Sequence, residues 1–121
     1  MPKFHFQQVS EVRTPAPNSA SRWAPAMDVV ETAAAYVVRI EVAGIDKDEL
    51  KLGFGDNTLT VRGERRRDDP GANLSFLRME IEYGEFHREV EFPKPVDRGA
   101  VRAHYQNGFL KVVLPKHEST T

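Results

Sequence analysis

The side chains best suited to metal or nucleophilic chemistry are scattered along this sequence. No two histidines have the spacing of a metal-binding pair, and there is no cysteine to supply a thiolate or a disulfide. We therefore expect neither a metal nor any other cofactor. Packing or solvated roles are expected for all four histidines, His5, His87, His104 and His117.

Two pairs of glutamates place both carboxylates on one face of a strand. Glu80 with Glu82, and Glu89 with Glu91, resemble acid/base dyads superficially, but on an antiparallel sheet the same pattern marks the face in contact with water. A hydrolase built on Glu80, Glu82 or His87 is the weakest of the functions weighed. No glycine motif precedes a helix as a phosphate loop would, so nucleotide binding has no support. The sequence thus favours a protein that is not an enzyme.

Composition excludes some partners. The 121 residues include 17 basic and 18 acidic side chains, so no strong net field points to nucleic acid or to an anionic membrane. No apolar run is long enough for a signal peptide or a membrane span. A cytoplasmic protein with one domain is expected.

Alternation of apolar and polar residues predicts strands that must form the framework. The stretch 36–43 alternates throughout, and the stretches 50–54 and 59–62 alternate on either side of the turn-forming residues 55–57. At most one helical turn is expected, at 46–50. The pattern therefore predicts one single strand and one hairpin in this half of the chain.

A second hairpin is predicted near the end of the chain. Asn107-Gly108 is a strong type I′ turn signal between the alternating stretches 101–106 and 110–114. Short strands separated by turns at this spacing indicate an all-β fold, an immunoglobulin-like antiparallel β-sandwich.

The stretch 84–92, GEFHREVEF, contains a charged residue on an apolar face. In a strand, Arg88 shares its face with Phe86, Val90 and Phe92. An unpaired buried guanidinium is costly, so Arg88 either finds carbonyl or carboxylate partners or extends its head to water along its apolar stem.

Two segments lie outside the predicted sandwich. Residues 1–26 are rich in proline and form a largely flexible arm, which still carries the apolar residues Phe4, Phe6, Val9 and Val12. A polar loop from residue 65 leads to an alternating stripe over 76–83 that is predicted as a strand, with Leu77, Met79 and Ile81 on one side. A loop of this length needs a partner subunit or a ligand to order it, or is disordered.

Several motifs together resemble the small heat-shock protein family, which carries the α-crystallin domain. They are WAPAMDV at 23–29, YVV at 36–38 with VAG at 42–44, LTVRGER at 59–65, YGEFHR at 83–88 followed by FP and VD, AHYQNGFL at 103–110 and VLPK at 113–116. The resemblance covers residues 23–116 and implies a flexible arm over 1–26, an α-crystallin domain over 27–115 and a short tail over 116–121.

This resemblance implies an ATP-independent holdase that binds partly unfolded proteins and hands them to ATP-dependent chaperones. It also implies a homodimer, and further homo-oligomers, in which the strand of the long loop pairs with the second strand of the partner. The implied interface residues are Leu77, Met79, Ile81, Met27, Val29 and Arg88. The arm, with Phe4, Phe6, Val9, Val12 and Trp23, would capture clients.

A second implied site is a groove at the edge of the sandwich, where an I-x-I tail docks. The matching apolar positions also suit a plain core, and both interpretations stay open for Leu50, Leu52, Phe54, Val101, Ala103 and Tyr105. No I-x-I sequence follows Pro115. A client segment, or the tail of another small heat-shock protein, is therefore expected in the groove, and cages linked by tails are not.

The alternative to a holdase is a CS-type co-chaperone or adaptor sandwich that binds a folded partner. It shares the topology but lacks the exchanged strand, so the long loop argues against it.

Overall fold

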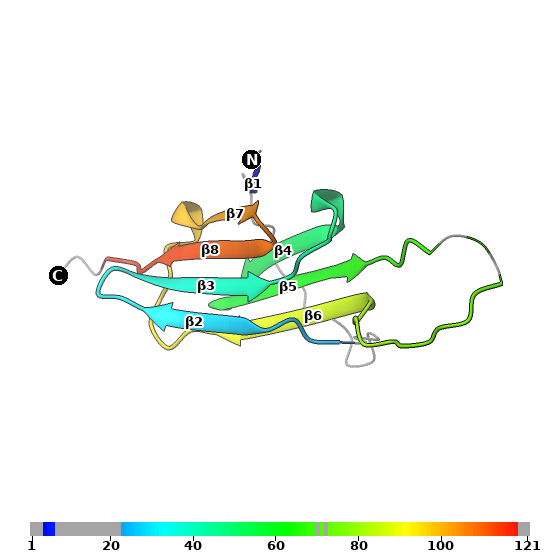
Figure 1. Cartoon of the computed structure of the whole chain (residues 1–121). Helices are drawn as coiled ribbons and strands as arrows, with labels where there is room; N and C mark the ends of the chain where they lie inside the picture. Colours follow the sequence, from blue (N-terminus) through cyan, green and yellow to red (C-terminus); the bar gives the residue numbers. More distant parts are fainter. Residues whose placement is uncertain (1–3, 7–22, 70, 72, 119–121) are drawn as a thin grey trace.

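The computed structural model describes residues 4–6, 23–69, 71 and 73–118, and within them the fold is all-β. Figure 1 shows two antiparallel sheets packed face to face, one with strand order β1-β7-β8-β3-β2 and the other with order β4-β5-β6. The strands are β1 (Phe4–Phe6), β2 (Met27–Glu31), β3 (Ala35–Glu41), β4 (Leu50–Gly55), β5 (Thr58–Arg65), β6 (Gly84–Glu91), β7 (Arg102–Gln106) and β8 (Phe109–Pro115). Two 3₁₀ turns, η1 (Lys47–Glu49) and η2 (Arg98–Ala100), are the helical elements of the described chain. The predicted antiparallel β-sandwich is confirmed.

The core lies between the sheets and is built from the alternating positions of the strands. Val38 and Ile40 of β3 are fully buried, and their cross-strand partners on β8 are Val112 and Leu110, which are also fully buried. Burial of each such side chain stabilises the fold by about 1.5–3 kcal/mol. The alternation in the sequence therefore identified the inward face of these strands correctly.

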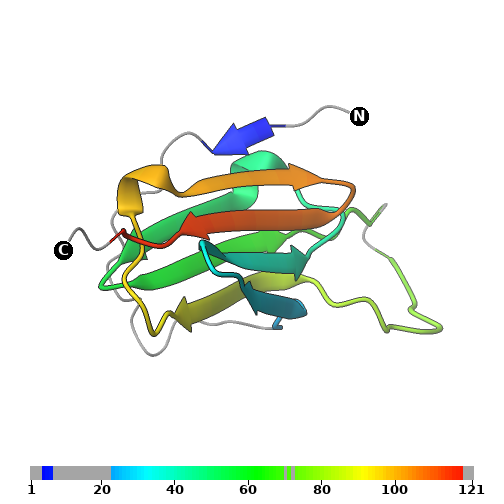
Figure 2. The ribbon, with the colours of Figure 1, turned by 90° about the vertical axis from the view of Figure 1, so that its left-hand side faces the viewer.

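Both predicted hairpins are present, and their turns have the expected backbone. Asn107 and Gly108 connect β7 to β8 with φ angles of 55° and 80°, and Asp56 and Asn57 connect β4 to β5 with φ angles of 51° and 55°. Positive φ at both central residues is the requirement of a type I′ turn, which glycine and asparagine meet at low cost. Figure 2 shows the two hairpins in opposite layers of the sandwich.

Gly63 lies in β5, the central strand of the smaller sheet, and allows neighbouring segments to pack closely against this strand. A Cβ atom at this position would lie 2.4 Å from the carbonyl oxygen of Glu49 and 2.9 Å from Cζ of Phe86. Because Glu49 belongs to η1 and Phe86 to β6, only a residue without a side chain lets these neighbours approach β5 from both sides.

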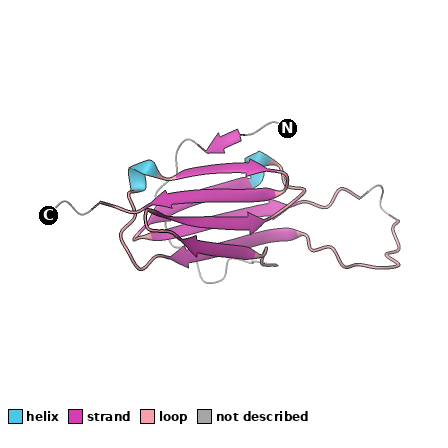
Figure 3. Cartoon of the chain, turned by 60° about the vertical axis from the view of Figure 1, so that its left-hand side comes forward, coloured by secondary structure: helices cyan, strands magenta, loops and turns pink. Residues whose placement is uncertain are grey.

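The structure differs from the sequence prediction at two places. No strand forms over 76–83, and the described residues between β5 and β6 make a long loop that projects beyond the sandwich (Figure 3). The prediction of a strand was wrong for the single chain. Alternation of side chains favours an extended backbone, but a strand also needs a neighbouring strand with which its backbone can pair, and alternation does not supply one. Conversely, β1 lies within the predicted arm, where no strand was expected.

An ion-pair cluster fixes the end of β2. The carboxylate of Glu31 lies 2.7 Å from Nζ of Lys116 and 3.4 Å from Nζ of Lys94, and Lys116 also donates to the carbonyl of Thr32. The hydrogen bond from Lys116, helped by Lys94, lowers the pKa of Glu31 below its ordinary value. The cluster joins the β2–β3 hairpin to the residues that follow β8.

Candidate functional site

Strand β2 forms an edge of the larger sheet, and two of its apolar side chains are not covered by any of the residues that the structure describes. It pairs with β3 on one side and has no strand on the other. Met27 packs against the core, whereas Val29 is 43% exposed and Val30 is 54% exposed. An open edge of this kind offers unpaired backbone groups together with apolar contact area.

The loop between β5 and β6 carries the largest set of exposed apolar side chains in the described chain. Leu77 is 99% exposed, and Met79 and Ile81 are each about two-thirds exposed. Leu74 and Phe76 are also exposed, and the sequence analysis did not assign them although both lie in the same apolar-rich stretch. Apolar side chains grouped in this way mark a surface that contacts another molecule.

Arg88 lies on the inner face of β6, as the alternation predicts. It is half-buried opposite Val61 of β5, and β6 is the edge strand of the smaller sheet. Its Nη1 donates to the carbonyl of Pro25 at 3.3 Å. Pro25 lies in the segment that leads into β2. The guanidinium is therefore tolerated because it reaches a backbone acceptor at the edge, and that acceptor lies in its own chain.

The residues predicted to form the groove mostly belong to the core. Five of them are buried in the core cluster: Leu50, Leu52, Phe54, Val101 and Ala103. Tyr105 is half-buried, and its hydroxyl donates to the carbonyl of Val42 at 2.7 Å. Burial raises the pKa of Tyr105. Five of the six positions thus contribute to the core, and the groove stays a prediction.

The outer edge of β7 is occupied by a strand of the same chain. In antiparallel register, Phe4 of β1 is opposite Tyr105 and Phe6 is opposite Ala103. The edge of β7, next to the residues predicted to form the groove, is therefore paired within the same chain. Val9 and Val12, also predicted to capture clients, lie outside the described residues.

Trp23, assigned to the arm by the sequence, is built into the end of the sandwich. Its indole Nε1 donates to the carbonyl of Gly84 at 3.0 Å, and its ring meets that of Phe86 edge to face at 5.4 Å. Its backbone forms a parallel bridge with Phe86. Sequence periodicity gave no signal for these contacts because they join residues far apart in the chain.

The acidic and histidine side chains of the described residues do not form a group suited to bind a metal ion. No three aspartate, glutamate or histidine side chains of residues 4–6, 23–69, 71 and 73–118 gather where they could hold a metal ion. Glu80, considered as a general acid or base, is exposed and pairs with Arg78 at 3.0 Å. No helix among these residues has the length and apolarity required to cross a membrane.

Solved structures of similar fold include a small heat-shock protein from Xylella fastidiosa reported to have a distinct high order structure. It superimposes with a TM-score of 0.75 at 29% identity, over 84% of this chain and 93% of that one. Heat shock protein 16.0 from Schizosaccharomyces pombe superimposes with a TM-score of 0.72 at 27% identity, over 83% of this chain and 93% of that one.

Curated relatives agree with the structural matches. The small heat shock protein C2 of Rickettsia felis is 28% identical over 94 residues, which are 78% of this chain and 61% of the relative. The 19.0 kDa class II heat shock protein of Oryza sativa is 37% identical over 98 residues, which are 74% of this chain and 56% of the relative. This chain therefore spans less than two thirds of the length of either relative.

The family assignment follows from a match over most of the chain. The model of the Hsp20/alpha crystallin family matches residues 28–121, which contain every strand except β1 and the start of β2. This match confirms the resemblance seen in the motifs, and the chain belongs to the Hsp20/alpha crystallin family.

Proposed function

We propose that the protein is an ATP-independent holdase that binds partly unfolded proteins and prevents their aggregation. The observation that carries the proposal is the match of residues 28–121 to the Hsp20/alpha crystallin family, together with a sheet edge at β7 that accepts an extended segment. Unfolding proteins expose apolar segments. The free energy of the system falls when such a segment covers apolar area on another surface. Nothing in this step requires nucleotide.

The exposed apolar stripe of the loop, in which Leu77 is 99% exposed, supports assembly into a homodimer. Leu77, Met79 and Ile81 alternate in sequence and would complete a strand if a partner offered a free sheet edge, and β2 is such an edge with Val29 exposed on it. Pairing of the loop with β2 of a second copy would satisfy backbone groups and cover apolar area on both sides. Dimers built in this way can assemble further into homo-oligomers.

Arg88 is proposed to support this interface from within the subunit. By donating to Pro25, it holds the segment that enters β2, to which the partner's loop would pair. Arg88→Ala should therefore lower the free energy of unfolding by about 1–3 kcal/mol through loss of a charged donor, and shift the dimer toward monomer in light scattering.

The control for Arg88 is Arg62→Ala, an exposed arginine on the outer face of the adjacent strand β5. This variant should leave both stability and mass unchanged. If Arg88→Ala behaves like Arg62→Ala in both measurements, Arg88 is a surface group whose head merely reaches water, and its interface role is wrong.

The β7 edge is proposed as a second capture site, for an extended client segment or for the tail of another small heat-shock protein. The pairing of β1 with β7 supports this proposal, because it is an example of an extended F-x-F segment accepted at that edge. A client would have to displace β1. Phe4, Phe6, Val9 and Val12 are proposed as further client contacts of the arm. Trp23, which the resemblance also implied as a client contact, packs against Phe86 and Arg65 of its own chain.

The cellular setting follows from the proposed activity. A holdase releases its clients to ATP-dependent chaperones, and we place the protein in the cytoplasm, without enzymatic activity or cofactor. The alternative, a CS-type adaptor for a folded partner, gives no role to the long apolar loop. Client turbidity during heating without nucleotide tests the holdase directly.

A further inference from the structure

Arg65 joins the two ends of the long loop to the body of the sandwich. It is the last residue of β5, where the loop begins, and its Nε donates to the carbonyl of Glu82 at 2.9 Å, near the point where the loop ends. Its Nη1 donates to the carbonyl of Ala43 at 3.0 Å, in the link that follows β3. This side chain of β5 thus holds two separate segments through their backbone carbonyls.

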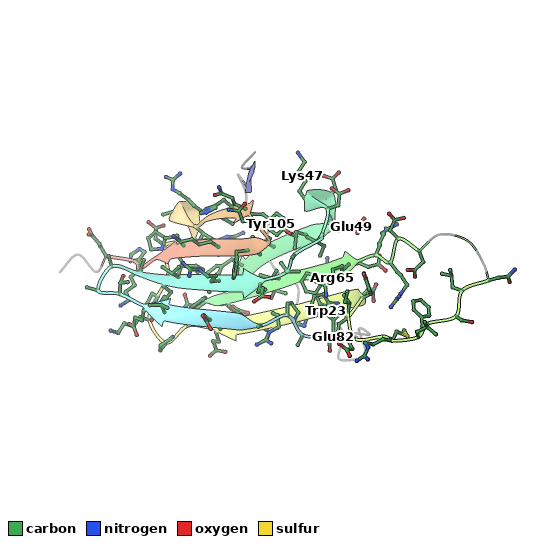
Figure 4. All side chains as sticks on the ribbon, viewed as in Figure 1. Trp23, Lys47, Glu49, Arg65, Glu82 and Tyr105 are labelled. Carbon is green, nitrogen blue, oxygen red and sulfur yellow. The ribbon has the colours of Figure 1, made fainter. Side chains whose placement is uncertain are left out.

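The same guanidinium covers the ring of Trp23. Its Cζ lies 4.1 Å from the centroid of the indole, which is within the range of a cation–π interaction. The indole in turn donates to the carbonyl of Gly84, two residues after Glu82. Figure 4 shows Arg65, Trp23 and Glu82 gathered at the end of the sandwich from which the loop leaves.

We propose that Arg65 is a positioning residue that anchors the N-terminal arm and the long loop together. Trp23, which follows the arm, and Glu82, at the end of the loop, both contact the Arg65 side chain. Loss of this side chain would release the two segments in concert while the core strands stay folded. The anchor rests on contacts within one chain, whereas its effect on assembly rests on the proposed function.

The anchor requires arginine rather than any cation. A planar guanidinium can donate in two directions to Glu82 and Ala43 while its face lies on the indole. A lysine ammonium is a point charge that can stay near the ring but cannot reproduce this fork. Arg65→Lys therefore separates the arm contact from the loop contact.

The neighbouring residue provides a matched control. Arg66 is also basic, but its side chain is 70% exposed. Among the described residues, its ion-pair partners are the carboxylates of Glu49, at 3.1 Å, and Glu64, at 3.4 Å. Arg66→Ala removes the same charge one position further along the chain. It should change neither the environment of Trp23 nor the protection of the start of β6.

Two measurements on the full-length protein test the anchor. The chain contains a single tryptophan, so its fluorescence reports on Trp23 alone. In Arg65→Ala, the emission should shift to longer wavelength and acrylamide quenching should increase. Amide hydrogen exchange over 82–86 should accelerate by about tenfold or more, as expected for the loss of charged hydrogen bonds, while β3 and β8 exchange as in the wild type.

Arg65→Lys should accelerate the same amides while leaving most of the Trp23 emission unchanged. The proposal is overturned if Arg65→Ala leaves fluorescence and exchange like those of Arg66→Ala. It is also overturned if exchange accelerates equally in β3 and β8, because Arg65 would then only contribute to global stability. Failure of the proposed strand exchange would appear elsewhere, as an unchanged dimer mass when residues 72–80 are deleted.

Discussion

Deletion of residues 72–80 is expected to convert the proposed dimer into a folded monomer. The deletion removes the most exposed part of the apolar stripe, including Leu77 and Met79, and leaves the base of the loop at Arg65 and Glu82. Without this segment, β2 of the partner has no strand to pair with, so the main contact between subunits is lost. Light scattering at micromolar concentration should give the mass of one chain, against the mass of a dimer or a larger oligomer for the wild type.

A second variant separates the length of the loop from its apolar character. Serine at positions 77, 79 and 81 keeps the chain length but removes the three side chains that would cover the partner's edge strand. This variant should also be a monomer. If both variants keep the dimer mass, the subunits associate through another surface and the exchange model fails.

Asn57→Ala is expected to give the largest loss of stability from a single side chain outside the core. The amide Nδ2 of Asn57 donates to the carbonyls of Phe92 and Lys94, each at 2.8 Å, and its Oδ1 accepts from the amide of Val96 at 2.9 Å. Alanine would leave these backbone groups without their partner and would hold a positive φ. The free energy of unfolding should fall by about 2–4 kcal/mol, measured by chemical denaturation.

Asn107→Ala is the matched control for this change. Asn107 has the same φ of 55° in the other hairpin, but within the described chain no side-chain hydrogen bond of this kind is found for it. Its replacement should cost about 1 kcal/mol, the penalty of a left-handed residue with a Cβ. Equal losses in the two variants would show that the bonds from Asn57 to the segment after β6 do not stabilise the fold.

The hairpins and the inward faces of the strands could be predicted because their causes are local. A period of two identifies the face of a strand, and Asn107-Gly108 fixes a turn without knowledge of the rest of the chain. The same rule placed Arg88 on the inner face of β6. It could not show that the guanidinium reaches Pro25, because that contact depends on how distant segments meet.

The features that escaped prediction depend on partners far away in sequence. Phe4–Phe6 forms a strand only because the edge of β7 is available to pair with it. Residues 76–83 alternate as a strand would, yet no strand of the described part of the chain lies beside them. Alternation alone also cannot distinguish a core from a groove. The sequence therefore left both interpretations open for Leu52 and Ala103, and only the structure shows that these two side chains are buried.

Aggregation of a thermally unfolding client protein, followed by turbidity without nucleotide, tests the holdase proposal most directly. With this protein in molar excess, the turbidity of the client should stay near the unheated baseline, and the client should remain in the soluble fraction bound to it. An inert protein at the same concentration controls for crowding. Turbidity equal to that of the client heated with the inert protein would contradict the proposed function.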